Sequence, residues 1–175
     1  MRARMTLSII VASLLATAVP AAASKRPTGP THSQISAAVA RVKRSRNLWA
    51  TVNICNTKRH PDVVGIRGQM PALGFSSALS MQVELRYWSD AEKRYKALAN
   101  TKHTLALGAE RNGLRQGGIS FQFTPHAGTL AGTVRFEWRL HSRAIGHVVR
   151  HTSADHPDAD QADPAHFSAG KCTIS

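Results

Sequence analysis

The feature that most constrains this chain is an alternation of apolar and polar residues with a period of two. It is clearest where every second residue is apolar, at Val134, Phe136, Trp138 and Leu140. The residues between them are all charged or polar. Because successive side chains of a strand point to opposite faces, this segment predicts a strand with one buried and one solvated face.

Similar short runs recur along the chain, separated by turn-forming residues. They lie at 48–55, 63–70, 81–88, 95–99, 103–107, 119–123, 147–152 and 172–174. Residues 142–146 predict the connection of a hairpin, residues 108–118 a loop, and Gly65 with Gly68 a bulge or bend. We therefore expect an all-β fold, an antiparallel sandwich of about eight strands, with a barrel as the alternative.

The N-terminus has the organisation of a signal peptide over residues 1–23. Arg2 and Arg4 precede an apolar run from Leu7 to Val19, and small residues follow at 21–23. The run is shorter than the roughly 20 residues that span a bilayer. We expect a secreted or envelope protein without a transmembrane segment after signal removal; the alternative is an N-terminal anchor or a buried helix.

Two further regions complete the expected domain organisation. Residues 24–46 form a linker followed by a weak helix or an irregular strand, since Ile35, Val39 and Val42 have helical spacing. Residues 47–175 form the β-sandwich domain. The length of 175 residues suits one such domain.

The chain has only two cysteines, Cys55 and Cys172. An exported protein meets an oxidising environment, so we expect them to form a disulfide. The alternative is a catalytic thiol, but Cys55 lies inside an apolar alternating run and lacks a Cys-x-x-Cys partner.

Four segments carry a resemblance to known proteins: Leu48–Cys55, Val64–Gly68, Val134–Trp138 and Phe167–Cys172. They resemble segments of uncharacterised secreted proteins of high-GC soil bacteria. The resemblance implies an immunoglobulin-like sandwich and carries no activity or functional residue with it. The two cysteines are too far apart in the sequence for the usual immunoglobulin pair, and Phe167 lacks the hydroxyl of a tyrosine corner. The resemblance therefore concerns architecture only.

The composition is strongly basic, with 23 Lys and Arg against 10 Asp and Glu and a net charge of +13. Clusters lie at Arg41–Arg46 and Lys93–Lys96. For an exported protein this charge favours anionic cell-wall polymer, acidic polysaccharide or a phospholipid surface over nucleic acid, for which no aromatic stacking motif is present. The alternative is a merely solvated basic surface.

A stretch near the C-terminus is rich in potential metal ligands: His151, Asp155, His156, Asp158, Asp160, Asp163 and His166. Carboxylates suit Ca²⁺, and mixed His and Asp sets suit Zn²⁺. The alternative is an exposed acidic loop that offsets a basic body, and we expect no obligatory cofactor.

Two further pairs are candidates for binding. His141 and His147 flank the expected hairpin connection and would share a metal if they faced each other. Trp49 and Trp88 lie opposite the aliphatic rows of their strands. They would form an aromatic binding patch if exposed; the alternative is that they cover the edge of the core.

No residue is identified as catalytic, because the common hydrolase, metalloprotease and nucleotide-binding motifs are absent. We therefore expect a non-catalytic envelope or extracellular binding module whose ligand the sequence does not name. The alternatives are a small secreted metal-dependent hydrolase that uses the C-terminal His/Asp region, and a purely structural surface protein.

Overall fold

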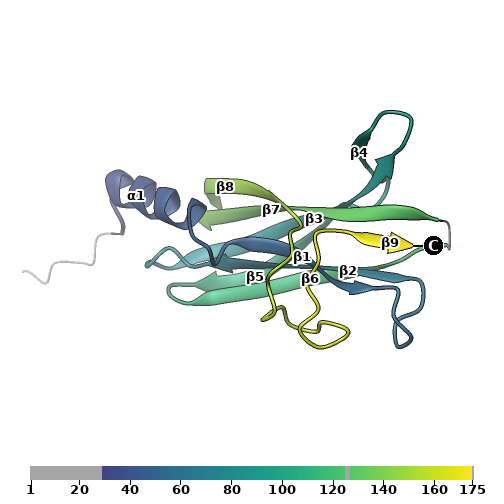
Figure 1. Cartoon of the computed structure of the whole chain (residues 1–175). Helices are drawn as coiled ribbons and strands as arrows, with labels where there is room; N and C mark the ends of the chain where they lie inside the picture. The colour runs from purple at the N-terminus through teal and green to yellow at the C-terminus, as the bar shows by residue number, and fades with distance from the viewer. Residues whose placement is uncertain (1–28, 125–126, 175) are drawn as a thin grey trace, which may run out of the picture.

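Two β-sheets pack face to face, and helix α1 lies at one end of them (Figure 1). The computed structural model describes residues 29–124 and 127–174. The elements are α1 (His32–Lys43), β1 (Trp49–Cys55), β2 (Val63–Pro71), β3 (Ser77–Ser89), β4 (Arg94–Ala97), β5 (His103–Glu110), β6 (Leu114–Gln122), β7 (Gly128–Leu140), β8 (Arg143–His151) and β9 (Cys172–Ile174). The expected all-β, antiparallel class is confirmed, whereas the expected signal peptide lies outside the described residues.

The smaller sheet has the strand order β1-β2-β6 and the larger one the order β4-β3-β7-β8. In the larger sheet, β5 also pairs with β3, and β9 also pairs with β7. Strands β5 and β6 are consecutive in the chain but belong to different sheets, so the turn between them carries the chain from one layer to the other.

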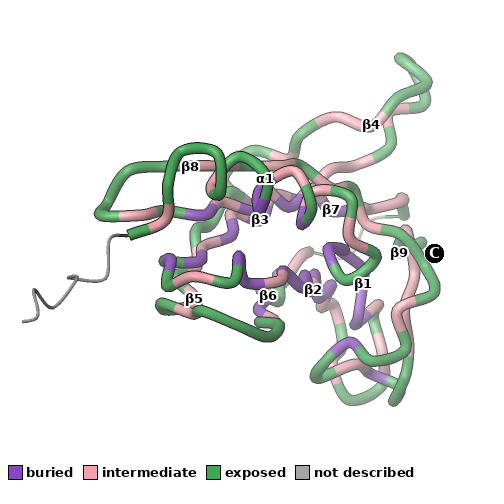
Figure 2. Tube along the Cα trace, turned by 90° about the vertical axis from the view of Figure 1, so that its left-hand side faces the viewer, coloured by how far each residue is buried: buried purple, intermediate pink, exposed green. Residues whose placement is uncertain are grey.

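The core fills the space between the layers, where buried residues line the facing sides (Figure 2). Phe136 and Trp138 of β7 are fully buried, as are Ile66 and Met70 of β2. The indole of Trp138 donates a hydrogen bond of 2.9 Å to the carbonyl of Pro71, at the end of β2. This bond joins the two sheets and satisfies a polar group that would be costly to bury alone.

Of the two alternatives for residues 24–46, a weak helix or an irregular strand, the structure has the helix, α1, over His32–Lys43. Thr31 caps the helix and forms a capping box with Gln34, which satisfies backbone groups at the helix start. Val39 and Val42 are buried in the same core as the sheets. Val39 packs directly on Gly146 of β8, where an added Cβ would lie only 2.6 Å from the valine. Glycine therefore allows α1 to approach the sheet closely.

The structure corrects two expected boundaries. The predicted loop at 108–118 is wrong for most of its length, because β5 extends to Glu110 and β6 begins at Leu114. The predicted hairpin of β7 and β8 is confirmed, but its connection contains only His141 and Ser142. The added ends of β5, β6 and β8 lack a strong apolar alternation. They form strands because their backbones pair with β3, β2 and β7, respectively.

The bulge or bend predicted at Gly65 and Gly68 lies instead in the neighbouring strand β1, opposite Gly65, and Gly68 pairs in regular register with Ala50. The register between β1 and β2 shifts between Val52 and Ile54, so that Asn53 is the extra residue. A Cβ at Gly65 would lie 2.6 Å from the side-chain oxygen of Asn53. The glycine therefore makes room for the bulged side chain.

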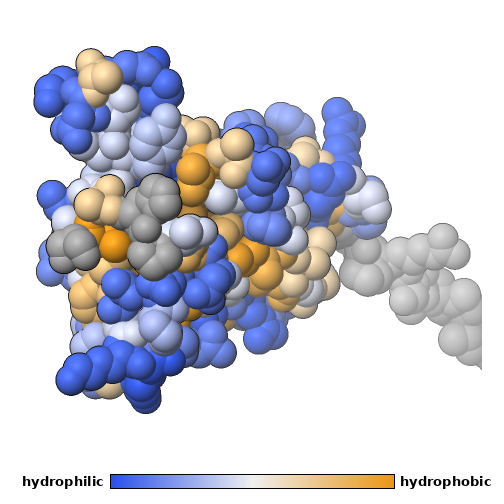
Figure 3. Space-filling view, turned by 90° about the vertical axis from the view of Figure 1, so that its right-hand side faces the viewer, coloured by the Kyte–Doolittle hydropathy of each residue, from blue (hydrophilic) through white to orange (hydrophobic). Residues whose placement is uncertain are grey.

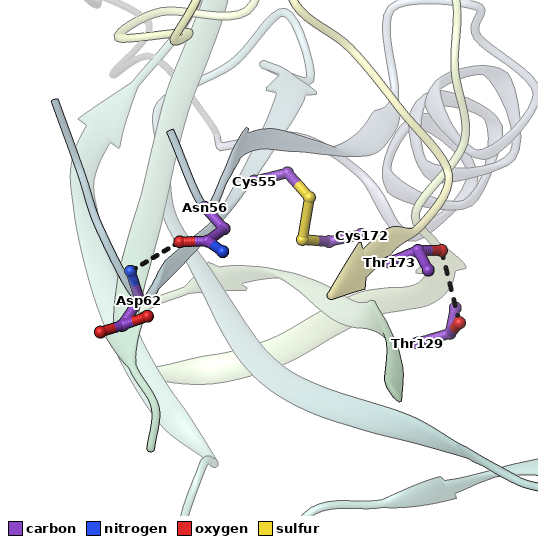
Figure 4. The surroundings of a disulfide bond; sticks show 6 residues. All are labelled: Cys55, Asn56, Asp62, Thr129, Cys172 and Thr173. Carbon is purple, nitrogen blue, oxygen red and sulfur yellow. Dashed lines mark hydrogen bonds between the residues drawn. A yellow bond between two sulfur atoms is a disulfide. The ribbon is translucent and has the colours of Figure 1, made fainter. Parts of the chain in front are cut away.

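The expected disulfide is present and joins the two sheets (Figure 4). Cys55 ends β1 in the smaller sheet, and Cys172 begins β9 in the larger one, with their Cα atoms 5.4 Å apart. On the Cys55 side, Asp62 donates its backbone N–H to the Asn56 side chain at 2.8 Å. In the chain-entropy model, closing so long a loop contributes about 4–5 kcal/mol.

We expect the double variant Cys55→Ser/Cys172→Ser to lose about 2–5 kcal/mol of unfolding free energy, because the link between the sheets no longer restricts the unfolded chain. Urea unfolding at neutral pH, monitored by tryptophan fluorescence, measures this loss. Wild-type protein unfolded in excess reductant provides the control and should match the variant. A variant as stable as the oxidised wild type would contradict this role.

Candidate functional site

A group of cationic side chains gathers where α1 packs on the edge strand β8. We call this group the α1–β8 basic surface; it comprises Arg41, Lys43, Arg44, Arg46, Arg143 and Arg150. The guanidinium of Arg150 donates to the carbonyl of Lys43 at 2.6 Å, which ties the strand to the end of the helix. Arg41 and Lys43 lie in the last helical turn, where positive charge interacts favourably with the helix dipole.

The charge of this surface is not neutralised by neighbouring carboxylates. Among the described residues, none of the six forms an ion pair, although six of the acids elsewhere do: Glu84, Asp90, Glu92, Glu110, Glu137 and Asp163. Glu137 alone is contacted by two arginines, Arg135 and Arg139. Of the eleven described Lys and Arg residues that form no ion pair, six therefore lie at α1 and β8.

A cavity of about 690 Å³ lies against the same helix. Arg41 of α1, Arg111 of the β5–β6 turn and His141 of the β7–β8 turn line it, together with the segment after β2. The Arg41 guanidinium donates to the carbonyl of Leu73 at 2.9 Å, which fixes the side chain at the wall. No Asp or Glu belongs to the described lining, so the cavity suits an anionic group.

The C-terminal residues take a different role, which the sequence did not indicate. Residues 152–171, here called the C-terminal strap, run from β8 past β1 to β9 (Figure 1). Val52 and Ala169 exchange two backbone hydrogen bonds of 2.8 and 3.0 Å, and Asp163 donates its N–H to the carbonyl of Asn53. The Asn53 side chain donates in turn to the carbonyls of Asp160 and Gln161. The strap thus covers the free edge of the smaller sheet.

One carboxylate of the strap is buried and fully engaged. Asp163 accepts hydrogen bonds from the Arg59 guanidinium at Oδ1 and from the Thr57 hydroxyl at Oδ2. The Nδ1 of His60 lies 2.9 Å from the same Oδ2. These bonds, that of Arg59 first, hold the pKa of the Asp163 carboxyl well below its usual range. The cluster fastens the strap to the loop between β1 and β2.

Two aromatic rings meet beneath the strap. The imidazole of His156 stacks on Trp49, with ring centroids 4.7 Å apart and planes 9° apart. Burial lowers the pKa of His156, and its Nε2 lies 3.0 Å from the hydroxyl of Ser153. Trp49 is only 7% exposed. The Trp49 side chain is therefore covered by the strap and does not contribute an accessible face to a binding patch.

The other predicted metal ligands are spread along this region. His151 contacts the Thr133 hydroxyl, and His166 contacts the carbonyl of Pro157. Asp155, Asp158 and Asp160 are exposed. Within the described part of the chain, no three His, Cys, Asp or Glu side chains are grouped so that they could hold a metal ion.

The remaining candidates lie apart from one another. Trp88, at the end of β3, is 37% exposed and makes an edge contact with Tyr95 of the β3–β4 hairpin. It belongs to the opposite sheet from Trp49. His147 lies opposite Glu137 in the β7–β8 register, whereas His141 lies in the turn and lines the cavity beside α1.

Arg111 and the partners of Asp163 are residues that sequence reasoning missed. Arg41 and Arg111 are far apart in the sequence, and only the placement of the β5–β6 turn brings both to one cavity. Thr57, Arg59 and His60 belong to a polar turn whose composition predicts only exposure. No local pattern signals that this turn meets a carboxylate more than 100 positions away.

Comparison with known proteins adds no family. No family model matches the chain, and no curated protein matches it. Among solved structures, a putative β-galactosidase from Bacteroides fragilis superposes with a TM-score of 0.32 and 11% identity, over 62% of this chain and 16% of that one. Across residues 29–124 and 127–174, no helix has the length and apolar character needed to cross a membrane.

We expect the stability that Asp163 contributes to depend on pH. Its folded pKa lies below the ordinary carboxyl value of 3.8, so the contribution is complete above that pH and is lost as the pH falls through and below it. Asp163→Asn should therefore lower the melting temperature at about pH 7, and its difference from wild type should shrink toward about pH 2. Thermal unfolding over this pH range measures both effects.

Asp155→Asn is the matched control, because Asp155 lies on the same strap but is exposed and forms no ion pair among the described residues. It should melt with the wild type at every pH. Equal losses of melting temperature for the two variants would show that Asp163 does not hold the strap through its charge. A loss for Asp163→Asn that does not change with pH would show the same.

Proposed function

We propose that this chain is an exported, non-catalytic binding module with an immunoglobulin-like sandwich, and that it binds an anionic polymer of the cell envelope, either a wall polymer or an acidic polysaccharide. The observation that carries the proposal is the α1–β8 basic surface, whose six cations have no carboxylate partner among the described residues. A polymer with regularly spaced negative charges would supply those partners from outside.

The geometry of the basic end supports a polymer over a single small anion. Arg143 and Arg150 lie at opposite ends of β8, a nine-residue strand. Arg44 and Arg46 extend the charge beyond the end of α1. A strand rises about 3.3 Å per residue, so the cations are spread over a distance that several charged groups of a chain would cover. The adjoining cavity, with Arg41, Arg111 and His141, would take one anionic group of the same polymer.

Two further observations support export. The charge pattern of residues 1–23 is that of a signal peptide. A disulfide between the two sheets is compatible with an oxidising compartment outside the cytoplasm. Export from the cytoplasm and an immunoglobulin-like topology are therefore parts of the proposal.

We expect the triple variant Lys43→Gln/Arg44→Gln/Arg46→Gln to bind dextran sulfate about tenfold more weakly than wild type, because each exposed charge contact contributes a few tenths of a kcal/mol to 1 kcal/mol. Retention of the wild type on immobilised dextran sulfate should decrease as salt screens the charges. Neutral dextran should retain neither protein. Salt-gradient elution and a titration at fixed ionic strength measure both effects.

The matched control is Lys93→Gln/Arg94→Gln/Lys96→Gln, which removes the same net charge from the β3–β4 hairpin, where these residues already pair with Asp90 and Glu92. It should retain most of the wild-type affinity. Equal loss in both triple variants would show that binding follows net charge alone, and binding to neutral dextran would remove the electrostatic basis of the proposal.

A further inference from the structure

The end of the sandwich opposite α1 contains a second cavity, of about 580 Å³. Among its described lining residues are the aromatic Tyr87, Trp88 and Phe123 and the larger aliphatic Leu98, Leu130 and Ile174. Figure 3 faces this end and shows hydrophobic residues gathered below the lobe of the β3–β4 hairpin. The volume is within the range of cavities that bind small molecules, about 300–1,000 Å³.

The cavity is continuous with the core. Ile174 belongs to the buried core, and Leu98, Phe123 and Leu130 pack against it. Residues of both sheets and of the hairpin meet here, because Leu130 lies on β7, Phe123 follows β6, and Leu98 follows β4. The two layers thus separate at this end and leave apolar surface accessible to solvent.

The described lining contains no charged side chain, although the chain carries a net charge of +13. The indole N–H of Trp88 is already engaged, since it donates to Asp90 at 3.1 Å. Tyr95 holds the indole ring in an edge contact, with centroids 5.2 Å apart. Trp88 therefore offers mainly ring surface, and being 37% exposed it remains accessible.

The lining residues indicate which class of ligand the cavity can bind. A saccharide needs several side-chain donors and acceptors, and the described lining offers only the hydroxyls of Tyr87, Thr124 and Thr129. An anionic ligand would find no cation in the part of the lining that the structure describes. A flat apolar molecule can stack or pack edge-on against the aromatic rings and release water from the aliphatic surface.

We propose that this cavity binds a small, uncharged aromatic molecule. The site is independent of the anionic polymer proposed above, because it lies at the other end of the sandwich and shares no lining residue with the cavity beside α1.

N-phenyl-1-naphthylamine, an uncharged aromatic dye that fluoresces in apolar surroundings, is a suitable probe for the full chain. We expect a saturable fluorescence increase with the wild type. Ala97 is exposed, and it lines the cavity from β4. Ala97→Trp should fill the cavity and weaken dye binding at least about tenfold. Ala109→Trp, at an exposed alanine of β5 outside the cavity, is the matched control and should bind as the wild type does.

Two further measurements keep the proposal open to disproof. Backbone amide shifts on dye binding should be confined to residues around Tyr87, Leu98 and Leu130, and excess glucose should not displace the dye. Retention on dextran sulfate should be unchanged by Ala97→Trp, which separates this site from the polymer site. Non-saturable fluorescence, equal binding by the two tryptophan variants, or displacement by glucose would overturn the proposal.

Discussion

The structure depends on how the edge strand β1 is covered. From Trp49 to Ile54 every residue of this strand is buried, so neither of its faces is solvated. One face lies on the core, and the C-terminal strap covers the edge and the other face through its bonds to Val52 and Asn53. An uncovered edge would present unpaired backbone groups to other chains. The Asp163 cluster and the disulfide hold the strap at two points, and thereby complete the sandwich.

The same arrangement separates the charges of the molecule. The exposed acids of the strap, Asp155, Asp158 and Asp160, lie along the smaller sheet, whereas Arg41 and Arg143 belong to α1 and β8. Since the strap is held by β1, its carboxylates do not reach the cations of the α1–β8 basic surface among the described contacts. From the sequence alone, the acidic residues near the C-terminus could neutralise the basic residues around Arg41–Arg46. In the folded chain the two remain distinct surfaces, and this separation is what makes an external anionic partner a reasonable proposal.

The two proposed sites lie at opposite ends of the two packed sheets. At one end, α1 fits against Gly146 and leaves a cavity lined by arginines. At the other end, the layers part beside the β3–β4 hairpin and leave a cavity lined by aromatic rings. The core between them is well packed around Phe136 and Trp138, so the two proposed sites, which differ in chemical character, lie at opposite ends of one packed core.

The sequence by itself determined the fold class, most strand positions and the disulfide partners. These follow from local periodicity and from having only two cysteines, because burial of one face imposes a period of two on strands and of 3.6 on helices. The extension of β5 and β6 through Glu110 and Leu114 escaped prediction, since backbone pairing needs no side-chain pattern. Only the tertiary structure decided that Asp163 meets Arg59, that His156 stacks on Trp49, and that Arg41 shares a cavity with Arg111. Such contacts join residues distant in sequence, and their geometry is set by how the sheets, the turns and the strap pack together.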